Sequence, residues 1–324
     1  MIVHVYSGIT SRLFTIADAI EIVQACSGKK ALVILWPIVN ECNIDIREVL
    51  DDIRCQDIDI TIESFKTAKK QLREINISKS VWKSLVALIY NLYPMAYNFI
   101  FDNESKMLKK YAGTNERYEY NPPVGIGWEG EPFENFKQRI WKEVKTRLQK
   151  DSDIYIHAYH DIIYETHEYS CLNTLLFKQE YWEKVEQILG DVKRNDIIGV
   201  HIRRTDHSIC IRMSPLVLFL QKMDEMIERN SEIRFFLATD DEDTQKELIN
   251  RYGNRIIIQK KVWGRDSVNG MKSGIIDCLC LSRCSLVLGS CTSAFSEFAA
   301  KYGGIELIQM GKESMGDTVG ADRK

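Results

Sequence analysis

Apolar and polar residues alternate in blocks through the carboxyl-terminal part of the chain, over residues 196–302. Short, nearly continuous apolar runs are each followed by a longer segment with apolar residues at helical spacing. This pattern predicts buried parallel strands connected by helices, as in a doubly wound α/β sheet. The predicted strands are 196–202, 233–239, 255–259 and 285–290, and the predicted helices are 214–229, 242–252, 275–284 and 293–302.

The first residues of the chain repeat this plan on a smaller scale. A strand at 2–6 is followed by a turn at Gly8, a helix over 12–27 and a second strand at 31–36. The helix has apolar residues at steps of three and four, so one of its faces would pack on a sheet. We therefore expect an α/β protein with two Rossmann-like doubly wound domains facing a cleft. The expected domains are 1–185 and 186–324.

The segment between these two halves is rich in charged and aromatic residues, and its periodicity is weaker. The sequence predicts a short strand within 153–161. It also predicts a long loop at 115–132, where prolines and glycines interrupt any regular pattern.

An apolar run at 81–101 is long enough to span a membrane. Polar residues and Pro94 interrupt it, so a buried helix broken near Pro94 is the better interpretation. The amino-terminal "MIVHVYSG" lacks the basic start of a secretory signal. The nine cysteines include no CxxC pair, which favours reduced thiols over disulfides or zinc ligands. We therefore expect a cytoplasmic protein.

The formal net charge of −3 gives no global attraction to nucleic acid, so arginines that bind a ligand are expected to act locally. The predicted strand at 196–202 ends in "HIRRTD", which supplies His201, Arg203, Arg204 and Asp206. Ligands bind at the carboxyl ends of strands in open parallel sheets, and arginine suits bidentate contact with phosphate. Since side chains alternate along a strand, we expect one of the two arginines to face the ligand.

The alternative for both arginines is a structural one, in which they form surface salt bridges to the acidic residues after the next strand. Asp240 and Asp241 lie there, in a turn that favours aspartate for its own sake. If Arg203 faces the ligand, we expect Arg204 to hold the loop against Asp206 or Asp240.

The last predicted strand runs into "GSCTSAFSEF", just before a helix. Ser290, Thr292 and Ser293 could cradle an anion there, or merely cap that helix. Asp277 is a lone carboxylate near the start of an apolar helix, where a dipole interaction and a polar ligand contact are both open.

Some nucleotide-binding and hydrolytic motifs are missing from the sequence. The turn from Gly8 to Arg12 lies at a strand exit, but "GITSRL" lacks the GxGxxG fingerprint of dinucleotide sites. Neither a P-loop nor a GxSxG elbow occurs. ATPase chemistry of the P-loop kind is therefore excluded, and the chain has no nucleophile elbow of the GxSxG form.

The segments "HIRRTD" (201–206), "LATDD" (237–241) and "DCLCLSRCSLVLGSCTSAFSEFA" (277–299) together resemble the three motifs of the fucosyltransferase superfamily. This superfamily includes α1,2-, α1,6-, nodulation and protein O-fucosyltransferases, and the α1,6 type is most similar in motif order and spacing. "GITSRLFTIADAI" is similar to its "GxGNxLFxLAxA" segment, and "YIHAYHD" (155–161) to its "Y-L-x-G-Y" strand. The resemblance is strong over 195–303, thin over 1–37 and nearly absent between them.

This resemblance implies the two-Rossmann GT-B architecture, with GDP-fucose bound mainly by the carboxyl-terminal domain. It also implies that Arg203 contacts the diphosphate, His201 lies beside the nucleotide and Asp277 binds guanine. Thr292 and Ser293 match a hydroxyl pair near the phosphates. The other candidate donor-binding residues are Arg204, Asp240, Asp241, Ser290, Gly8, Ser11 and Arg12.

Two departures from the family pattern bear on catalysis. Thr10 and Ser11 stand where the family commonly has Gly and Asn, which leaves the ligand role of that loop open. After "RRTD" the α1,6 enzymes have a lysine and then a glutamate, whereas this chain has His207 and an apolar stretch. A base copied from that subgroup is therefore absent. Asp206 and His207 are the candidates that accept the proton of the acceptor hydroxyl.

These observations predict an inverting transferase that moves fucose from GDP-β-L-fucose to a hydroxyl of an oligosaccharide or surface-glycan precursor. We expect no metal, because arginine, hydroxyl groups and helix dipoles already supply positive character. We also expect no nucleic-acid partner, and a peripheral association with membrane-linked glycan precursors is compatible with this activity.

Two further questions stay open at this point. The aromatic residues at 118–128 are candidates for contacting the acceptor, and a loop packed by its own aromatic side chains is the alternative. The alternative functions are transfer from another nucleotide sugar and non-catalytic binding of a nucleotide sugar.

Overall fold

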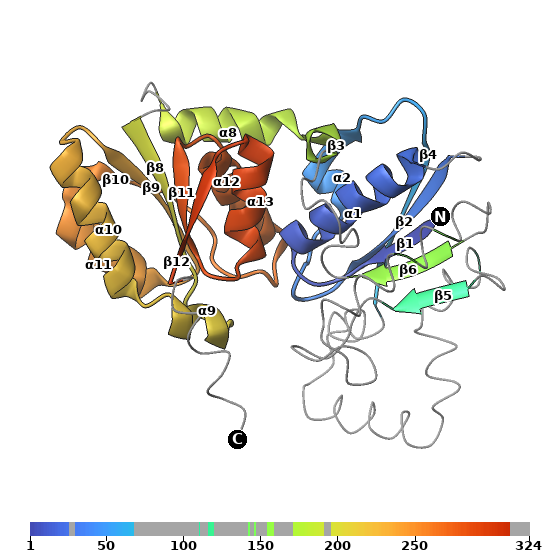
Figure 1. Cartoon of the computed structure of the whole chain (residues 1–324), viewed down its shortest axis with the longest axis horizontal. Coiled ribbons are helices and arrows are strands. Elements are labelled where there is room, and N and C mark those ends of the chain that lie inside the picture. The colour runs from blue at the N-terminus through green and yellow to red at the C-terminus, as the bar shows by residue number, and fades with distance from the viewer. Residues whose placement is uncertain are drawn as a thin grey trace, which may run out of the picture. The chain divides into compact units, whose positions relative to one another are not determined.

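The computed structural model (Figure 1) describes residues 1–25, 30–67, 110, 116–119, 142, 146, 154–158, 171–190 and 196–311. The chain divides into two compact units. The first comprises Met1–Leu176 and Arg265–Ser267, and the second Phe177–Gly264 and Val268–Lys324. Helix α8 (Gln179–Leu189) lies entirely in the second unit. Within the described ranges, no helix is both long enough and apolar enough to cross a membrane.

The first unit contains a parallel five-stranded sheet in the order β4-β2-β1-β6-β5. Helix α1 (Ile9–Gln24) connects β1 to β2 and buries Leu13, Ile16 and Ile20. This confirms the predicted strand–helix–strand unit. The strands of the sheet are β1 (Ile2–Val5), β2 (Ala31–Ile38), β4 (Asp59–Lys66), β5 (Glu116–Glu119) and β6 (Ile154–Ala158).

Several features of the first unit differ from the expectations. Helix α1 begins at Ile9 rather than near residue 12, since Gly8 is extended and occupies the N-cap position. Residues 116–119 form β5 inside the predicted loop, because they pair with β6. Helix α2 (Ile46–Val49) and strand β3 (Leu50–Ile53) separate β2 from β4, and β3 pairs with β7 (Leu175–Phe177). The segment 81–101 and the rest of 115–132 lie outside the described residues.

The second unit is a doubly wound α/β domain, as the sequence predicts. Its parallel strands follow the order β10-β9-β8-β11-β12, so the direction of winding reverses between β8 and β11. The strands are β8 (Ile197–Ile202), β9 (Arg234–Thr239), β10 (Ile256–Ile257), β11 (Leu286–Ser290) and β12 (Glu306–Met310). The helices that follow α8 are α9 (Ser208–Met213), α10 (Leu216–Arg229), α11 (Glu242–Tyr252), α12 (Val268–Ser282) and α13 (Ala294–Gly303).

Helices α8 and α9 and strand β12 of this unit were not predicted, and two helices begin elsewhere than expected. Helix α9 has six residues, which is too short for a helical period to show in the sequence, and β12 is a short strand after α13. Helix α10 begins at Leu216 with Pro215 at the N-cap position, so Ser214 is not its cap. Helix α12 begins at Val268 instead of 275. Asp277 therefore lies in its third turn, where a dipole interaction with the helix N-terminus no longer accounts for it.

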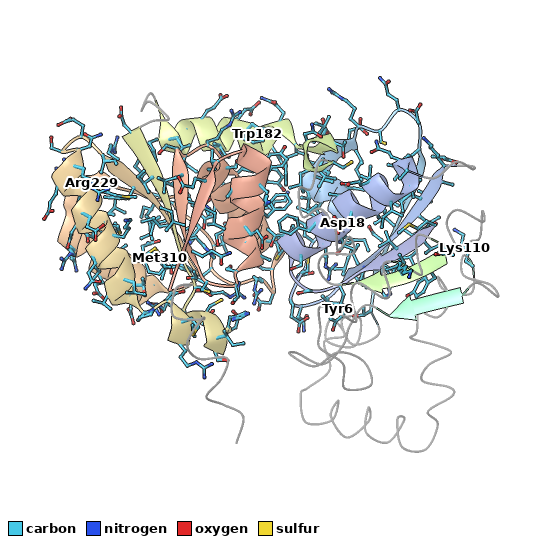
Figure 2. All side chains as sticks on the ribbon, viewed as in Figure 1. Tyr6, Asp18, Lys110, Trp182, Arg229 and Met310 are labelled. Atoms are coloured by element: carbon cyan, nitrogen blue, oxygen red, sulfur yellow. The ribbon has the colours of Figure 1, made fainter. Side chains whose placement is uncertain are left out.

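Helices cover both faces of the second sheet (Figure 1). On one face, Val200 and Phe235 of the strands cluster with Phe219 of α10 and Leu248 of α11. On the other face the helices approach so closely that glycine is required. A Cβ at Gly199, for example, would come within 2.9 Å of the Leu281 side chain of α12. Side chains fill the space between the sheet and its helices (Figure 2).

Two helical glycines provide a test of this packing. A Cβ at Gly303 of α13 would overlap the backbone carbonyl of Ser282, whereas a Cβ at Gly274 of α12 would meet nothing within 4 Å. We expect Gly303→Ala to lower the free energy of unfolding by about 1–3 kcal/mol, because the backbone must shift. Gly274→Ala should leave it unchanged or raise it by up to about 1 kcal/mol, since alanine favours helices. Urea denaturation of both variants measures the difference, and equal stabilities would contradict the packing.

Candidate functional site

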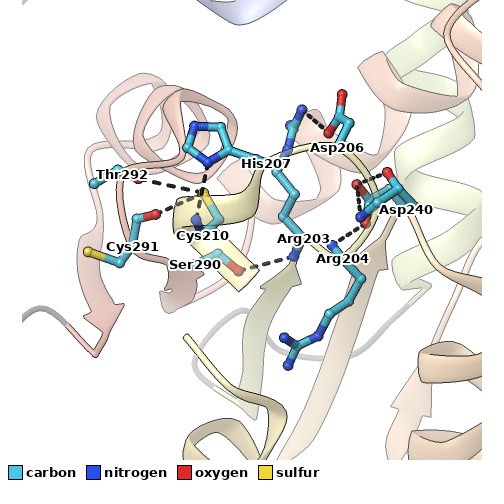
Figure 3. Close-up of polar contacts among 10 residues, drawn as sticks. Arg203, Arg204, Asp206, His207, Cys210, Asp240, Ser290, Cys291 and Thr292 are labelled. Carbon is cyan, nitrogen blue, oxygen red and sulfur yellow. Dashed lines mark hydrogen bonds and ion pairs between the residues drawn. The ribbon is translucent and has the colours of Figure 1, made fainter. Parts of the chain in front are cut away.

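Strands β8 and β11 lie side by side where the winding of the second sheet reverses. Their register pairs His201 with Gly289, so the segments that follow the two strands leave the sheet from adjacent positions. Loops diverge to opposite faces at such a switch point, and ligands bind there in open parallel sheets. The polar residues after β8 and those after β11 are therefore brought together (Figure 3).

The two arginines after β8 point in opposite directions (Figure 3). The Arg203 backbone N–H donates to Ser290 Oγ at 3.0 Å, and Arg203 Nη2 donates to Asp206 Oδ1 at 2.6 Å. The Arg203 Nε is buried and has no hydrogen-bond partner among the described residues. Arg204 turns away, with Nη1 3.5 Å from the carbonyl oxygen of Ile211. Of the two partners expected for Arg204, Asp206 pairs with Arg203 instead, and Asp240 accepts the backbone N–H of Arg204.

Asp240 and Asp241 both have partners within the protein. Asp240 Oδ1 accepts the backbone N–H of Arg204 at 2.7 Å, and Oδ2 accepts the Thr205 hydroxyl at 2.7 Å. Asp241 caps α11 by accepting the Thr244 hydroxyl at 2.6 Å and its N–H at 2.8 Å. These two hydrogen bonds lower the pKa of Asp241. The contacts support the structural alternative for both aspartates, and Asp240 fixes the loop that carries Arg203.

The loop after β11 adopts a strained conformation. Thr292 has a φ of +60°, which is a genuine outlier for a β-branched residue, and such outliers cluster at functional sites. Ser293 occupies the N-cap position of α13, yet its side chain does not cap the helix. The buried Ser293 hydroxyl has no partner among the described residues. The capping alternative for Ser293 is therefore wrong, and its hydroxyl faces the N-terminus of α13 without a protein acceptor in that part of the chain.

His201 is a buried residue of β8 that packs against α13. Its ring lies 4.8 Å from the ring of Phe295, measured between centroids. Burial, and then the positive charge of Arg203, lower the pKa of His201 to about 3, so the ring is neutral at physiological pH. Its Nδ1 is buried and has no partner among the described residues.

Four buried polar atoms in the segments at the ends of β8 and β11 have no described partner: His201 Nδ1, Arg203 Nε, Arg204 Nη2 and Ser293 Oγ. Because Arg204 turns away from Arg203 (Figure 3), the other three are the candidates for contacting a ligand at the switch point. Nearly every buried polar atom in a native protein has a hydrogen-bond partner, so each exception needs an explanation. Arg203 and the first turn of α13 add positive charge at the same place. This arrangement suits a ligand that carries several anionic oxygen atoms.

His207 acts as the N-cap of α9. Its Nδ1 accepts the backbone N–H of Cys210 at 3.1 Å, so the neutral ring carries its proton on Nε2. Burial lowers the pKa of His207, and the positive charge of Arg203 lowers it as well, so the neutral ring is favoured. Neither ring nitrogen is then available to accept a proton from a substrate. The structure argues against His207 as a base, and Asp206, with a side chain that is 41% exposed, remains the candidate.

Asp277 is buried in α12 and receives two donors from the segment after β10. Gln259 Nε2 donates to Oδ1 at 2.6 Å, and Lys261 Nζ donates to Oδ2 at 2.9 Å. Lys261 also donates to the carbonyl of Thr239 at the end of β9, at 2.6 Å. Burial raises the pKa of Asp277, and Lys261 opposes this effect. The sequence pattern did not single out Gln259 or Lys261, because only folding brings their segment to α12.

In the first unit, Arg12 is fully buried and is directed at the backbone. Its Nε donates to the carbonyl of Ser7 at 2.8 Å, and its Nη1 donates to the carbonyl of Pro37 at 2.6 Å. These contacts hold the turn before Gly8, in which Ser7 has a φ of +72°. Arg12 therefore ties the end of β1 to the end of β2, and Ser11 is buried beside it. Arg12 Nη2 is buried and has no partner among the described residues, so the donor-binding role of Arg12 stays a prediction.

Metal binding and disulfide formation can be followed in the described residues. There, no group of three or more His, Cys, Asp or Glu side chains is placed to hold a metal ion. None of the eight described cysteines forms a disulfide.

Comparisons with known proteins place the fold. No family model and no curated protein sequence matches the chain. Among solved structures, the NodZ α1,6-fucosyltransferase soaked with GDP-fucose aligns with a TM-score of 0.55 at 15% identity, covering 96% of this chain and 95% of that one. NodZ from Bradyrhizobium aligns with a TM-score of 0.54 at 15% identity, over 92% and 91% of the two chains. The apo form of POFUT1 aligns with a TM-score of 0.53 at 10% identity, over 96% and 97%. The chain has the fold of these GT-B-type fucosyltransferases.

The buried neutral His201 predicts a pH dependence of stability. In the unfolded chain the histidine has its ordinary pKa near 6.5, whereas in the folded protein the pKa is about 3. Between these values the unfolded state binds more protons, so stability is full above about pH 6.5 and is lost as the pH falls toward 3. From pH 7 to pH 4.5 the loss should be about 2–3 kcal/mol.

Replacing His201 by phenylalanine keeps a ring beside Phe295 and removes the titrating group. Urea denaturation at pH 7 and pH 4.5 should therefore show a smaller loss of stability in His201→Phe than in the parent protein. The same loss in both proteins would mean that His201 is protonated in the folded state.

Proposed function

We propose that this protein is a cytoplasmic, inverting glycosyltransferase that moves fucose from GDP-β-L-fucose to a hydroxyl of an oligosaccharide or surface-glycan precursor. The observation that carries the proposal is the set of buried polar atoms without described partners at the β8–β11 switch point, on His201, Arg203 and Ser293. A diphosphate offers the acceptor oxygens that such a set requires. The fold, which is that of GDP-fucose-binding transferases, supports this choice of donor.

Arg203 is the group to which we assign stabilisation of the leaving group. Negative charge grows on the diphosphate as the bond to the sugar breaks, so a fixed guanidinium binds the transition state more tightly than the ground state. The Ser293 hydroxyl and the first turn of α13 add donors on the other side of the switch point. Because these groups already provide positive character, we propose that the reaction needs no metal ion.

The proton of the acceptor hydroxyl must go to a base. We assign this role to Asp206, since the ring of His207 is committed to capping α9. The Asp206 carboxylate accepts a hydrogen bond from Arg203, which fixes it next to the group that stabilises the leaving diphosphate. This contact also occupies one oxygen of the carboxylate, which favours the second candidate function, non-catalytic binding of a nucleotide sugar. Turnover separates the two functions.

The first test compares the two arginines. We expect the parent protein to release GDP from GDP-fucose slowly without an acceptor, in buffer containing EDTA. Arg203→Lys should lower this rate by about 10²–10³, because lysine keeps the charge but loses the planar fork. Arg204→Lys should retain most of the rate, since Arg204 points away from the site.

Thermal melts establish that each of these variants is folded. An active Arg203→Lys protein would overturn the assignment of this strand end as the donor site. Binding of GDP without any turnover in the parent protein would favour the non-catalytic function, and restoration of activity by Mg²⁺ after EDTA would overturn metal independence.

The second test concerns recognition of the nucleobase of the donor, a role that we assign to Asp277. Each carboxylate oxygen of Asp277 accepts one protein donor and retains a second lone pair. Guanine offers two adjacent donors, N1–H and N2–H₂, whereas uracil and adenine have no such paired edge. Asp277→Asn should therefore weaken GDP binding by about 2–5 kcal/mol, because an amide nitrogen replaces one acceptor.

Calorimetry with GDP, UDP and ADP measures this selectivity. Asp243→Asn is the matched control, since it removes a carboxylate from α11 whose side chain is 93% exposed. Equal affinity of the parent protein for UDP and GDP would show that Asp277 does not select guanine, and the donor would then be another nucleotide sugar.

A further inference from the structure

The peptide groups on either side of Cys291 are held by a single short helix, α9. Ser214, the residue that follows α9, accepts the backbone N–H of Cys291 on its Oγ at 2.8 Å. Cys210 of α9 donates its thiol to the carbonyl oxygen of Cys291 at 3.0 Å (Figure 3). The donor and the acceptor of one residue are thus both bound by side chains of α9 and of the residue that follows it.

Helix α9 is itself fixed to the rest of the second unit. The Ser214 hydroxyl donates to the carbonyl of Met310 at the end of β12, at 2.6 Å. The helix begins at the His207 cap, immediately after the turn that carries Arg203. It also ends so close to β12 that a Cβ at Gly311 would overlap the carbonyl of Met213. Helix α9 therefore connects the two loops of the switch point to a rigid edge of the sheet.

The residue next to this doubly held peptide is Thr292, whose φ is +60°. A β-branched residue enters the left-handed region at a cost, and it stays there only when the surrounding contacts determine the conformation. The Cys210 thiol lies 3.6 Å from the Thr292 hydroxyl as well. Burial raises the pKa of Cys210, so the thiol keeps its proton and acts as the donor to Cys291.

We propose that Cys210 and Ser214 are positioning residues, which hold the strained Thr292 turn in the conformation that binds the diphosphate of the donor. The proposal rests on the proposed function for the identity of the anion. Neither residue touches the ligand in this role. Their effect passes through the Cys291 peptide, which aims the Thr292 and Ser293 groups before the ligand arrives.

A purely structural role would give a different result from a positioning role. In a structural role, removing the Cys210 thiol lowers the melting temperature and leaves the affinity for the ligand unchanged. In the positioning role, the turn relaxes when the thiol is removed, and the affinity falls as well. The measurement must therefore compare binding with stability in the same variants.

The central variant is Cys210→Ala, with Cys210→Ser as its conservative counterpart. We expect Cys210→Ala to raise the Kd for GDP about tenfold, as the loss of one hydrogen bond that fixes the turn implies. Cys210→Ser keeps a donor at this position, so its Kd should lie within about threefold of the parent value. The matched control is Cys284→Ala, which removes a buried thiol that lies before the start of β11 and donates to the carbonyl of Cys280 in α12 at 3.3 Å. It should lower the melting temperature without changing the Kd.

A double-mutant cycle with Thr292→Gly tests whether the effect passes through the strained turn. Glycine adopts positive φ without steric cost, so the turn should depend less on its clamp. Cys210→Ala should then change the Kd less than about threefold in the Thr292→Gly background, compared with about tenfold in the parent. Equal changes in both backgrounds would overturn the proposal, and so would an unchanged Kd in Cys210→Ala.

The outcome also separates this proposal from the proposed function. If the parent protein does not bind GDP, the same variants are titrated with inorganic pyrophosphate. Pyrophosphate binding that depends on Cys210 would support the positioning role and overturn the choice of GDP-fucose. Binding of neither compound would overturn both proposals.

Discussion

The parallel pairing of β8 with β11 is the constraint on which the candidate site depends. It places the backbone N–H of Arg203 against the Ser290 hydroxyl, so that the two loops of the switch point are joined at their origin. Gly289 permits this arrangement, because a Cβ there would come within 2.6 Å of the Cβ of Ser296 and keep α13 away from the strand. The N-terminus of α13 can consequently lie directly at the end of β11.

The sequence was sufficient to predict four of the five strands of the second sheet, all except β12, and the polar residues at their ends, because both follow from local patterns. The adjacency of β8 and β11 could not be predicted in the same way, since strand order is decided by long-range packing. Helix α9 was missed because six residues carry no period, and with it the capping role of His207. Arg12 was considered for a ligand because the turn from Gly8 to Arg12 lies at a strand exit and a helix start. Its acceptors are carbonyl groups, which a sequence pattern does not reveal.

The polar residues of the site fall into two groups with different roles. Asp240, Asp241 and His207 have their hydrogen bonds within the protein and fix the loops. His201 and Ser293 are buried with an atom that has no described partner, which leaves them to a ligand. Such a division is what a preorganised site requires, because the groups that meet developing charge must not have to reorient during the reaction. The satisfied residues therefore contribute to binding through the rigidity that they give to the others.

The electrostatics of the site lead to the same emphasis on geometry. Burial keeps His201 neutral, and Arg203 has one carboxylate partner in Asp206, so the positive character of the switch point comes from Arg203 and the first turn of α13 rather than from a cluster of cations. The net charge of the chain adds no general attraction for an anion. Affinity for a diphosphate must then come from the direction of a few donors, chiefly one planar guanidinium and the hydroxyls of one strained turn. For this reason the residues that hold the turn are expected to contribute to the affinity for a diphosphate, although they do not touch the ligand.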